Sequence, residues 1–232
     1  MTENERKNLI VYLSQYITPH KIRTVEKVLR NRTRYVTLIL EDIHKEHNAS
    51  ATLRTCEALG IQDVHIIENT THFTINKDVT LGSSKWISLN RYKDKHVDNT
   101  RTCLHALREK GYKIIATTPN AHSLPLEDLP FDGKFALLFG NEESGLSDCA
   151  LECADEQLKL PMYGFTASYN ISVSVGIALS FIIDKLRSSD IPWQLTDREK
   201  SELTLSWYRK IVRASDLLEE AYIKQQKKQT SC

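Results

Sequence analysis

Three short stretches of this chain carry the side chains that could do chemistry, and each mixes polar residues with small ones. They are Asn48–Arg54, Phe139–Ser147 and Leu160–Ser172. Each lies at a predicted strand-to-helix junction, where short polar side chains and free backbone N–H groups can hold a carboxylate or a hydroxyl. Open α/β sheets bind ligands outside the carboxyl ends of their strands, so the three junctions predict one shared pocket.

The middle stretch, Gly140–Ser147, has the glycines of a phosphate-binding loop but lacks its essential cation. Leu146 stands where the lysine of the GxxxxGK[ST] pattern must reach the phosphates. Glu142 and Glu143 would also repel a triphosphate, and the chain has no GxGxxG pattern for a dinucleotide. The stretch therefore predicts a glycine turn after a buried strand, where a ligand can approach the backbone beside a carboxylate.

The third stretch turns sharply after Leu160 and then enters a predicted helix. Capping of that helix accounts for one of the residues Ser168, Asn170 and Ser172, but less well for all three together. Ser172, Gly176 and Ser180 also share one face of the helix. Small residues at this spacing permit close packing against another segment or subunit.

The histidines and cysteines match no known metal-binding pattern. His44 and His47 precede the first stretch, but their spacing fits neither HExxH nor a His/Cys cluster. The five cysteines include no CxxC pair, and Cys149 and Cys153 have helical i, i+4 spacing without a further ligand. We expect reduced thiols and no bound metal.

Short apolar runs alternate with helical patterns along the middle of the chain, and glycines at 60 and 111 follow two of the helices, as C-terminal caps do. The strand-like runs are Val36–Leu40, Val64–Ile67, Trp86–Leu89, Lys113–Thr117, Phe135–Phe139 and Gln157–Leu160. The helical patterns are Ala49–Leu59, Thr100–Lys110, a short one after Leu146, and Ile171–Leu186. The alternation predicts an α/β fold with a mainly parallel sheet and helices on both faces.

Both ends of the chain are predicted to be helical. One or two amphipathic helices precede Tyr35, and Thr18-Pro19 begins the second. After a break at residues 188–192, Thr196–Glu199 forms a capping box. The helix that it opens carries an apolar face, which we expect to pack on the protein's own core or across a dimer. The members of this face are Leu203, Trp207, Ile211, Ala214 and Leu218.

The bulk composition is that of a soluble globular protein, with 232 residues of which 41% are hydrophobic and 26% charged. No apolar run reaches membrane-spanning length, and the polar N-terminus is not followed by a signal-peptide core. We therefore expect a cytoplasmic protein. The net charge of +1 gives no global argument for binding nucleic acid.

The basic residues are unevenly distributed, because six of them lie between Thr18 and Arg34 against Glu26 alone. Four recur at i, i+4, i+7 and i+11, which is one helix face if the helix extends that far. A solvated helix face is the alternative, but a catalytic domain next to the stripe favours contact with phosphates. The residues predicted to bind RNA are Arg23, Lys27, Arg30, Arg32 and Arg34.

With these motifs in order and at similar spacing, the chain resembles the SpoU/TrmH family of S-adenosylmethionine-dependent RNA ribose 2′-O-methyltransferases. The resemblance covers Tyr35 to Arg187 and departs from the family pattern at Tyr169, where leucine is more usual. It implies a SPOUT-type methyltransferase domain at 35–187 with a C-terminal trefoil knot, a basic helical N-terminal extension at 1–34 and a helical C-terminal extension at 188–232. Small members with helical extensions at both ends methylate guanosine 18 in the tRNA D-loop, and the chain resembles these members most, which implies tRNA as the substrate.

The resemblance also implies a homodimer, with the site near the subunit boundary, and assigns roles to individual residues. The residues implied to bind the methyl donor S-adenosylmethionine are Thr117, Gly140, Leu160, Met162 and Tyr169. The residues implied to be catalytic are Arg54, Asn48, Glu142, Ser168 and Asn170. The family proposal makes the arginine a general base. We expect a charged guanidinium to stabilise a developing alkoxide and bind the adjacent phosphate, and leave its protonation role open.

Three alternatives stay open at this point. The first is the same chemistry on ribosomal RNA or at another tRNA position, because the motifs build the methyl-transfer pocket and not the RNA-reading surface. The second is a non-catalytic RNA-binding relative, against which the retained Asn48, Arg54, Glu142 and Asn170 argue. The third is a generic nucleotide-binding α/β enzyme, which Leu146 weakens.

Overall fold

The structure is a computed structural model that describes residues 1–120 and 122–230, and the chain divides into two compact units. An α/β unit spans Thr33–Trp193. A helical unit combines Met1–Arg32 with the segment that begins at Gln194. No helix of the described part is both long and apolar enough to cross a membrane.

The α/β unit is built on a seven-stranded sheet with the order β3-β2-β1-β6-β4-β7-β5, in which every pairing is parallel. This confirms the α/β fold class, and the sheet is all-parallel where the sequence predicted a mainly parallel one. The strands are β1 Val36–Glu41, β2 Asp63–Ile67, β3 Ser88–Tyr92, β4 Lys113–Thr117, β5 Leu124–Pro125, β6 Phe135–Phe139 and β7 Glu156–Lys159.

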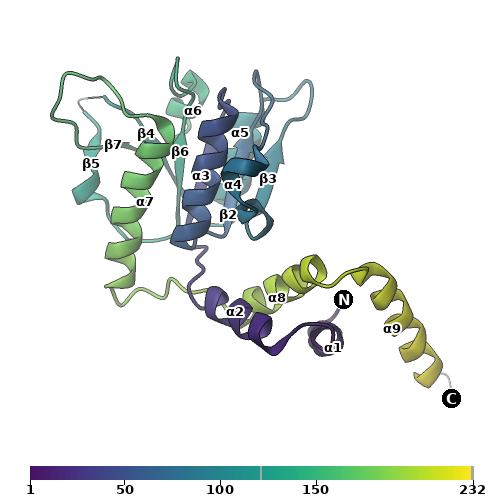
Figure 1. Cartoon of the computed structure of the whole chain (residues 1–232). Coiled ribbons are helices and arrows are strands. Elements are labelled where there is room, and N and C mark those ends of the chain that lie inside the picture. The colour runs from purple at the N-terminus through teal and green to yellow at the C-terminus, as the bar shows by residue number, and fades with distance from the viewer. Residues whose placement is uncertain (121, 231–232) are drawn as a thin grey trace. The chain divides into compact units, whose positions relative to one another are not determined.

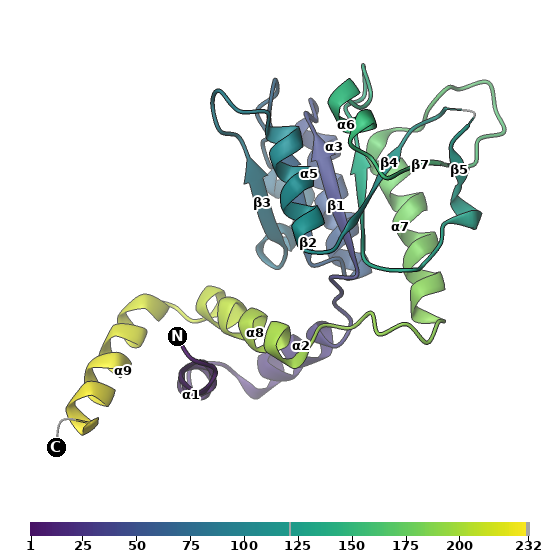
Figure 2. The same ribbon diagram turned by 180° about the vertical axis from the view of Figure 1, so that it is seen from behind.

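Helices cover both faces of the sheet, as βαβ crossovers require. Figure 1 shows the face covered by α3 (Glu46–Leu59), the short α4 (Lys77–Thr80) and α7 (Ile171–Arg187). Figure 2 shows the opposite face with α5 (Asn99–Glu109) and α6 (Asp148–Glu152). Two 3₁₀ turns, η1 (Ser83–Lys85) and η2 (Leu126–Asp128), complete the described elements of this unit.

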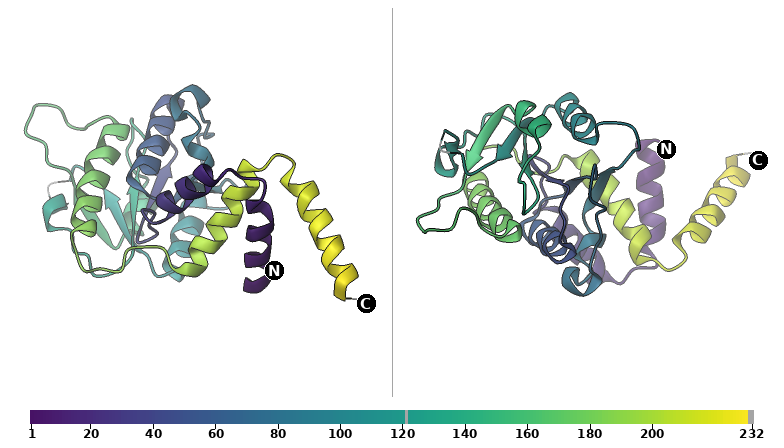
Figure 3. Two further views of the ribbon diagram at one scale, coloured as in Figure 1. Left: turned by 60° about the horizontal axis from the view of Figure 1, so that its bottom comes forward. Right: turned by 90° about the horizontal axis from the view of Figure 1, so that it is seen from above.

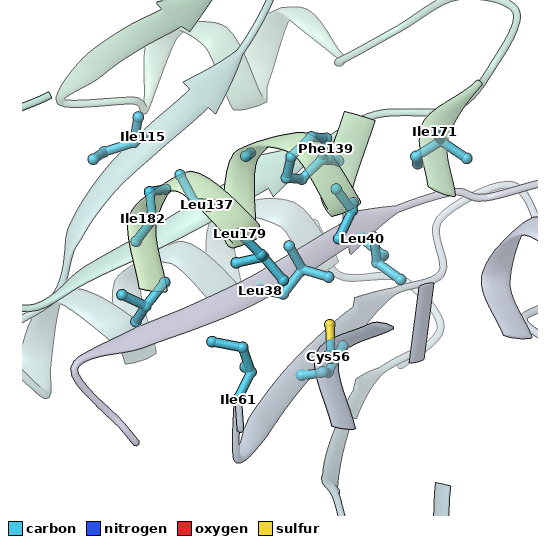
Figure 4. Close-up of a cluster of buried hydrophobic side chains, with 14 of the residues drawn as sticks. Leu38, Leu40, Cys56, Ile61, Ile115, Leu137, Phe139, Ile171, Leu179 and Ile182 are labelled. Atoms are coloured by element: carbon cyan, nitrogen blue, oxygen red, sulfur yellow. The ribbon is translucent and has the colours of Figure 1, made fainter. Parts of the chain in front are cut away.

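The larger part of the core lies between the central strands and helices α3 and α7. Leu38, Leu40 and Leu137 of the sheet pack against Leu179 and Ile182 of α7, and all are buried (Figure 4). The alternate strand residues point to the other face and pack on α5, as Ile39 and Leu138 do. Full burial of each such side chain stabilises the fold by about 1.5–3 kcal/mol, so both helical layers hold the sheet firmly.

Local capping signals of the sequence are confirmed. The Thr18 hydroxyl accepts a hydrogen bond from the backbone N–H of Lys21 at the start of α2. Thr196 and Glu199 form the predicted reciprocal capping box. Gly60 and Gly111 follow their helices with φ of 84° and 80°, in the left-handed region that favours glycine.

The predicted strand Trp86–Leu89 begins too early in the sequence. Trp86 belongs to the end of the η1 turn, because its N–H donates to the Ser83 carbonyl oxygen. The strand begins at Ser88 and continues to Tyr92, which pairs with Ile67 of β2. The polar residues of β3 lie at the edge of the sheet, where no apolar run is needed, so this strand was hard to delimit by pattern.

The helical unit contains α1 (Glu3–Ser14), α2 (Pro19–Leu29), α8 (Asp197–Ile211) and α9 (Ser215–Thr230), and α8 contacts the other three helices. The prediction of one continuous apolar face from Leu203 to Leu218 is wrong. Helix α8 ends at Ile211, and Ala214 has a φ of 55°, so the chain breaks before α9 begins. Trp207 is buried within α8, which fits the packing role expected for it.

Candidate active site

The candidate site lies at the carboxyl edge of the sheet, where the strand order reverses beside β1. Helix α3 follows β1, the Gly140 turn follows β6, and a long loop leads from β7 into α7; Figure 3 (right) views this edge from above. Ligands of parallel α/β sheets bind at such a switch point, because the neighbouring loops diverge there and leave a crevice. The fold therefore brings the three polar stretches to one edge.

Side chains from all three stretches are hydrogen-bonded to one another. The Asn48 side-chain amide donates to Glu142 Oε1 at 2.5 Å, and the Asn170 side-chain amide donates to Asn48 Oδ1 at 3.0 Å. The other oxygen, Glu142 Oε2, is buried without a hydrogen-bond partner among the described residues. Three of the five residues predicted to be catalytic thus form one polar cluster, the Asn48–Glu142–Asn170 cluster.

The Gly140 turn is closed by its own hydrogen bonds. Asn141 and Gly145 exchange backbone hydrogen bonds of 3.0 and 3.2 Å, and Asn141 Oδ1 accepts from the N–H groups of Glu143 and Ser144. A Cβ at Gly140 would lie 2.1 Å from the Gly145 backbone, so only glycine fits this close approach. The turn is a compact, preformed unit that carries Glu142.

The residues predicted to hold the methyl donor surround the ends of three adjacent strands. Thr117 ends β4 and its hydroxyl donates to the Leu138 carbonyl oxygen of β6 at 2.9 Å. The next residue, Thr118, donates its N–H to Leu158 of β7. Leu160 directly follows β7, and Gly140 directly follows β6.

The loop from Leu160 to Tyr169 has few internal hydrogen bonds. The Tyr169 hydroxyl donates to the Pro161 carbonyl oxygen at 2.8 Å and closes the loop. Within the described part of the chain, the backbone N–H groups of Met162–Tyr169 make no hydrogen bond to the protein. Ser168 lies exposed in this loop, apart from the Asn48–Glu142–Asn170 cluster. The loop therefore offers several free backbone donors beside the apolar side chains of Leu160 and Met162.

Arg54 lies on a different face of α3 from Asn48. Its side chain is exposed and lines a shallow hollow together with His47, Ala51 and Asp78. Six residues separate Arg54 from Asn48 along the helix, which amounts to about 9 Å of rise and a turn to another face. Within one subunit the structure does not bring Arg54 to the Asn48–Glu142–Asn170 cluster.

The basic stripe is shorter than predicted. Helix α2 ends at Leu29, so Arg34 does not lie on it; the Arg34 side chain donates to Asp63 at 2.8 Å. Arg32 is 1% exposed, and its guanidinium lies 5.5 Å from the centre of the Trp207 ring, so it is not presented on the surface. Of the five residues predicted to bind RNA, Arg23, Lys27 and Arg30 are exposed on or next to α2.

Sequence reasoning missed Glu41, the buried last residue of β1. Its Oε1 accepts from the hydroxyls of Thr100 and Ser147 at 2.6 and 2.8 Å, and its Oε2 accepts from the Ser147 N–H at 2.9 Å. A glutamate at the end of an otherwise apolar strand was the available signal, because a buried carboxylate needs donors.

The histidines and cysteines play no role in the hydrogen bonds of the Asn48–Glu142–Asn170 cluster. His44 lies 4.0 Å from the Glu143 carboxylate. The Cys149 thiol donates to Asp98, and burial with this carboxylate raises the pKa of Cys149 to about 12. Among the described residues, no group of three His, Cys, Asp or Glu side chains could hold a metal. Among the described residues, cysteines 56, 103, 149 and 153 form no disulfide bond, and Cys232 lies outside that part of the chain.

Comparison with known proteins identifies relatives of this chain. The model of the SpoU rRNA Methylase family matches residues 35–180. A tRNA (guanosine(18)-2′-O)-methyltransferase of Borreliella burgdorferi is 48% identical over 89% of this chain and 93% of its own length. The crystal structure of the A. aeolicus TrmH/SpoU tRNA modifying enzyme is similar with a TM-score of 0.73 and 27% identity, over 84% of this chain and 98% of that one.

The fold is shared more widely. The SpoU methyltransferase AviRb from Streptomyces viridochromogenes, solved in complex with its cofactor AdoMet, has a TM-score of 0.57 at 20% identity over 70% of this chain and 62% of that one. The family model covers more than half of the chain, and the Borreliella relative matches nearly all of it. This chain belongs to the SpoU rRNA Methylase family.

Proposed function

We propose that this protein transfers a methyl group from S-adenosylmethionine to a ribose 2′-oxygen of tRNA, at guanosine 18 of the D-loop. The observation that carries the proposal is the hydrogen-bonded cluster of Asn48, Glu142 and Asn170, assembled from three distant stretches at one sheet edge. The name of the 48% identical relative supports both the reaction and the nucleotide.

The residues at the carboxyl edge fit the methyl donor. The free N–H groups of Met162–Tyr169 suit a carboxylate, and the side chains of Leu160 and Met162 suit an adenine ring and a thioether. Thr117 and Gly140 complete the set at the ends of the two neighbouring strands. When bound, S-adenosylmethionine supplies an electrophilic methyl group on its sulfonium centre.

The side chains of the chain would orient the ribose and stabilise charge on its oxygen. Asn48 and Asn170 are fixed by their mutual hydrogen bond, and Glu142 Oε2 has acceptor capacity left for a donor. The Arg54 guanidinium is proposed to stabilise a developing alkoxide and to bind the adjacent phosphate. Ser168 is proposed to offer a hydroxyl to the ligands from the exposed loop after β7.

The position of Arg54 supports a proposed homodimer with a composite site. Since Arg54 lies apart from the Asn48–Glu142–Asn170 cluster within one subunit, we propose that it acts on the cluster of a second copy. Helix α7 supports a subunit contact, because Val173 and Phe181 are exposed on it beside the small residues Gly176 and Ser180. Mixing inactive Arg54→Ala and Asn170→Ala proteins would then restore about a quarter of the sites. No recovery in a mixture that sediments as dimer contradicts the composite site.

The basic N-terminal and helical C-terminal segments are proposed to bind tRNA around a central domain at 35–187. The helical unit contains 15 Lys and Arg against 9 Asp and Glu, whereas the α/β unit contains 16 against 21. Positive charge is therefore concentrated in the helical unit, as phosphate binding requires. Each of Arg23→Ala, Lys27→Ala and Arg30→Ala should reduce the salt slope of tRNA binding by about 1, with Lys134→Ala, at an exposed position of the α/β unit, as the control.

The trefoil knot is also proposed, on the basis of the family resemblance and the strand order. The chain returns twice to the middle of the sheet, because β6 lies between β1 and β4 and β7 lies between β4 and β5. Mechanical stretching of the α/β unit between residues 34 and 187 should give a contour length shorter than that of the fully extended chain, because a tightened knot retains part of the chain. Extension to the full contour length would show an unknotted chain.

Methyl transfer to unmodified tRNA tests the proposed function. We expect transfer that needs S-adenosylmethionine, and a 2′-O-methyl group at guanosine 18 by mass-spectrometric mapping. A matched tRNA carrying a deoxyguanosine at position 18 should accept no methyl group at that site. Methylation of ribosomal RNA or of another tRNA position instead would assign the same chemistry to a different substrate, and binding of tRNA without transfer would identify a non-catalytic relative.

A further inference from the structure

Glu41 stands at the end of the central strand β1 and ties that strand to the Gly140 turn. It is 2% exposed, and its carboxylate accepts three hydrogen bonds. Two come from the N–H and the hydroxyl of Ser147, and the third comes from the hydroxyl of Thr100 at the start of α5. A buried carboxylate with charge-assisted bonds to three donors is a strong and directional anchor.

Among the described residues, the Gly140 turn has two hydrogen-bonded attachments to β1. On one side, Phe139 pairs with Leu40 in the sheet. On the other side, Ser147 is held by Glu41 while its hydroxyl accepts from the Ala150 N–H and begins α6. Because the turn between these points is closed by its own hydrogen bonds, it can move only as a body. Its orientation therefore depends on the Glu41–Ser147 contact.

Glu142 depends on the turn for its position. Among the described residues, its carboxylate makes a single hydrogen bond, from Asn48, and its second oxygen has no partner. Asn48 also follows β1, so Glu41 ties the two halves of the Asn48–Glu142 contact to the same strand end. A displacement of about 1 Å in an active-site group can cost about 100-fold in rate.

We propose that Glu41 is a positioning residue: through Ser147 it orients the Gly140 turn so that Glu142 meets Asn48. The rate effect of this role rests on the proposed methyl transfer, but the contact itself does not. In the part of the chain that the structure describes, the Glu41 carboxylate accepts hydrogen bonds from Ser147 and Thr100, and neither residue is assigned to the donor or the ribose.

The test compares Glu41→Ala and Glu41→Gln with Glu68→Ala. Glu68 is a matched control, because it is also a buried carboxylate at the carboxyl end of a strand but binds Arg91 and the Phe73 N–H, away from the turn. Glu41→Gln keeps the size of the side chain and replaces one of its two acceptor oxygens by a donor. It serves as the second variant should Glu41→Ala fold poorly.

Two readouts separate positioning from general destabilisation. The first is the NMR signal of the Asn48 side-chain amide, identified by its loss in Asn48→Ala and measured without tRNA or donor. The second is the turnover per folded molecule in methyl transfer to tRNA. We expect Glu41→Ala to lose the Asn48 signal and to lose about 100-fold in turnover. Glu41→Gln should lose less of the signal and of the turnover. Glu68→Ala should keep both the signal and the turnover. The losses in Glu41→Ala and Glu142→Gln should not add in the double variant, because both act on one contact.

The proposal is overturned if both Glu41 variants retain the Asn48 signal and the turnover of Glu68→Ala, or if the losses of Glu41→Ala and Glu142→Gln add fully. Should the wild-type protein transfer no methyl group to tRNA, the proposed function fails, and the NMR comparison still decides the role of Glu41.

Discussion

The side-chain amide of Asn48 donates a 2.5 Å hydrogen bond to Glu142, 94 positions further along the chain. Asn48 lies in the first turn of α3 after β1, and Glu142 lies in the turn after β6. The two strands are neighbours in the sheet, so their following loops meet. The contact joins two motifs that the sequence predicted to share one pocket, although the sequence did not pair these two side chains.

Asn48→Ala should remove both the hydrogen bond to Glu142 and the hydrogen bond from Asn170. We expect methyl transfer to fall by about 100- to 1000-fold, the range for removal of one oriented polar group from an active site, with little change in the free energy of unfolding. Asn8→Ala, an exposed asparagine of α1, is the control for handling and folding. An Asn48→Ala enzyme within a few-fold of wild type would remove the cluster from the reaction.

Gly140→Ala should open the turn that carries Glu142. The added Cβ would lie 2.1 Å from the Gly145 backbone, so the turn must shift, at a cost of about 1–3 kcal/mol in the free energy of unfolding. Calorimetric titration should show weaker binding of S-adenosylmethionine. Gly133→Ala is a matched control, because a Cβ there meets nothing within 4 Å. Equal donor affinity in both variants would show that the turn tolerates the shift.

His65 should make the protein sensitive to mild acid. Burial, with a smaller effect of the Lys110 charge, lowers the pKa of His65 to about 4 from an ordinary value near 6.5. Between pH 6.5 and 4 the unfolded chain therefore binds a proton that the folded protein does not, and stability falls as the pH falls. The loss from this group should approach 3 kcal/mol.

Urea unfolding at pH 7 and pH 4.5 checks this expectation. His65→Gln should remove most of this pH dependence, whereas His105→Gln, at an exposed position of α5, should leave it unchanged. If the free energy of unfolding of His65→Gln depends on pH as strongly as that of the wild type, other groups cause the acid sensitivity.

Arg32→Lys should weaken folding more than RNA binding. The Arg32 guanidinium lies over the Trp207 ring and is buried, and a lysine keeps the charge but lacks the planar group. We expect a loss of about 1–2 kcal/mol in the free energy of unfolding, with tRNA affinity per folded molecule unchanged. The exposed Arg30→Lys is the matched control. If Arg32→Lys instead lost tRNA affinity with no change in the free energy of unfolding, Arg32 would be an RNA-binding residue after all.

The sequence by itself determined the features that depend on neighbouring residues. Thr18, Thr196 and Gly60 cap their helices as predicted, because capping joins groups only a few residues apart. The apolar runs that became β1, β2, β4 and β6 were recognised because strands buried on both faces are apolar throughout. The edge strand β3 and the break at Ala214 carry no such pattern and were misplaced.

Only the tertiary structure decided which distant groups meet. The strand order placed β6 beside β1, and this brought Glu142 to Asn48 and Ser147 to Glu41. The tertiary structure also placed Arg54 on the outer side of α3, and packing within the helical unit buried Arg32 against Trp207. Hydrogen bonds across 94 or 106 positions depend on how the chain crosses the sheet, and short-range sequence patterns contain no information about that crossing.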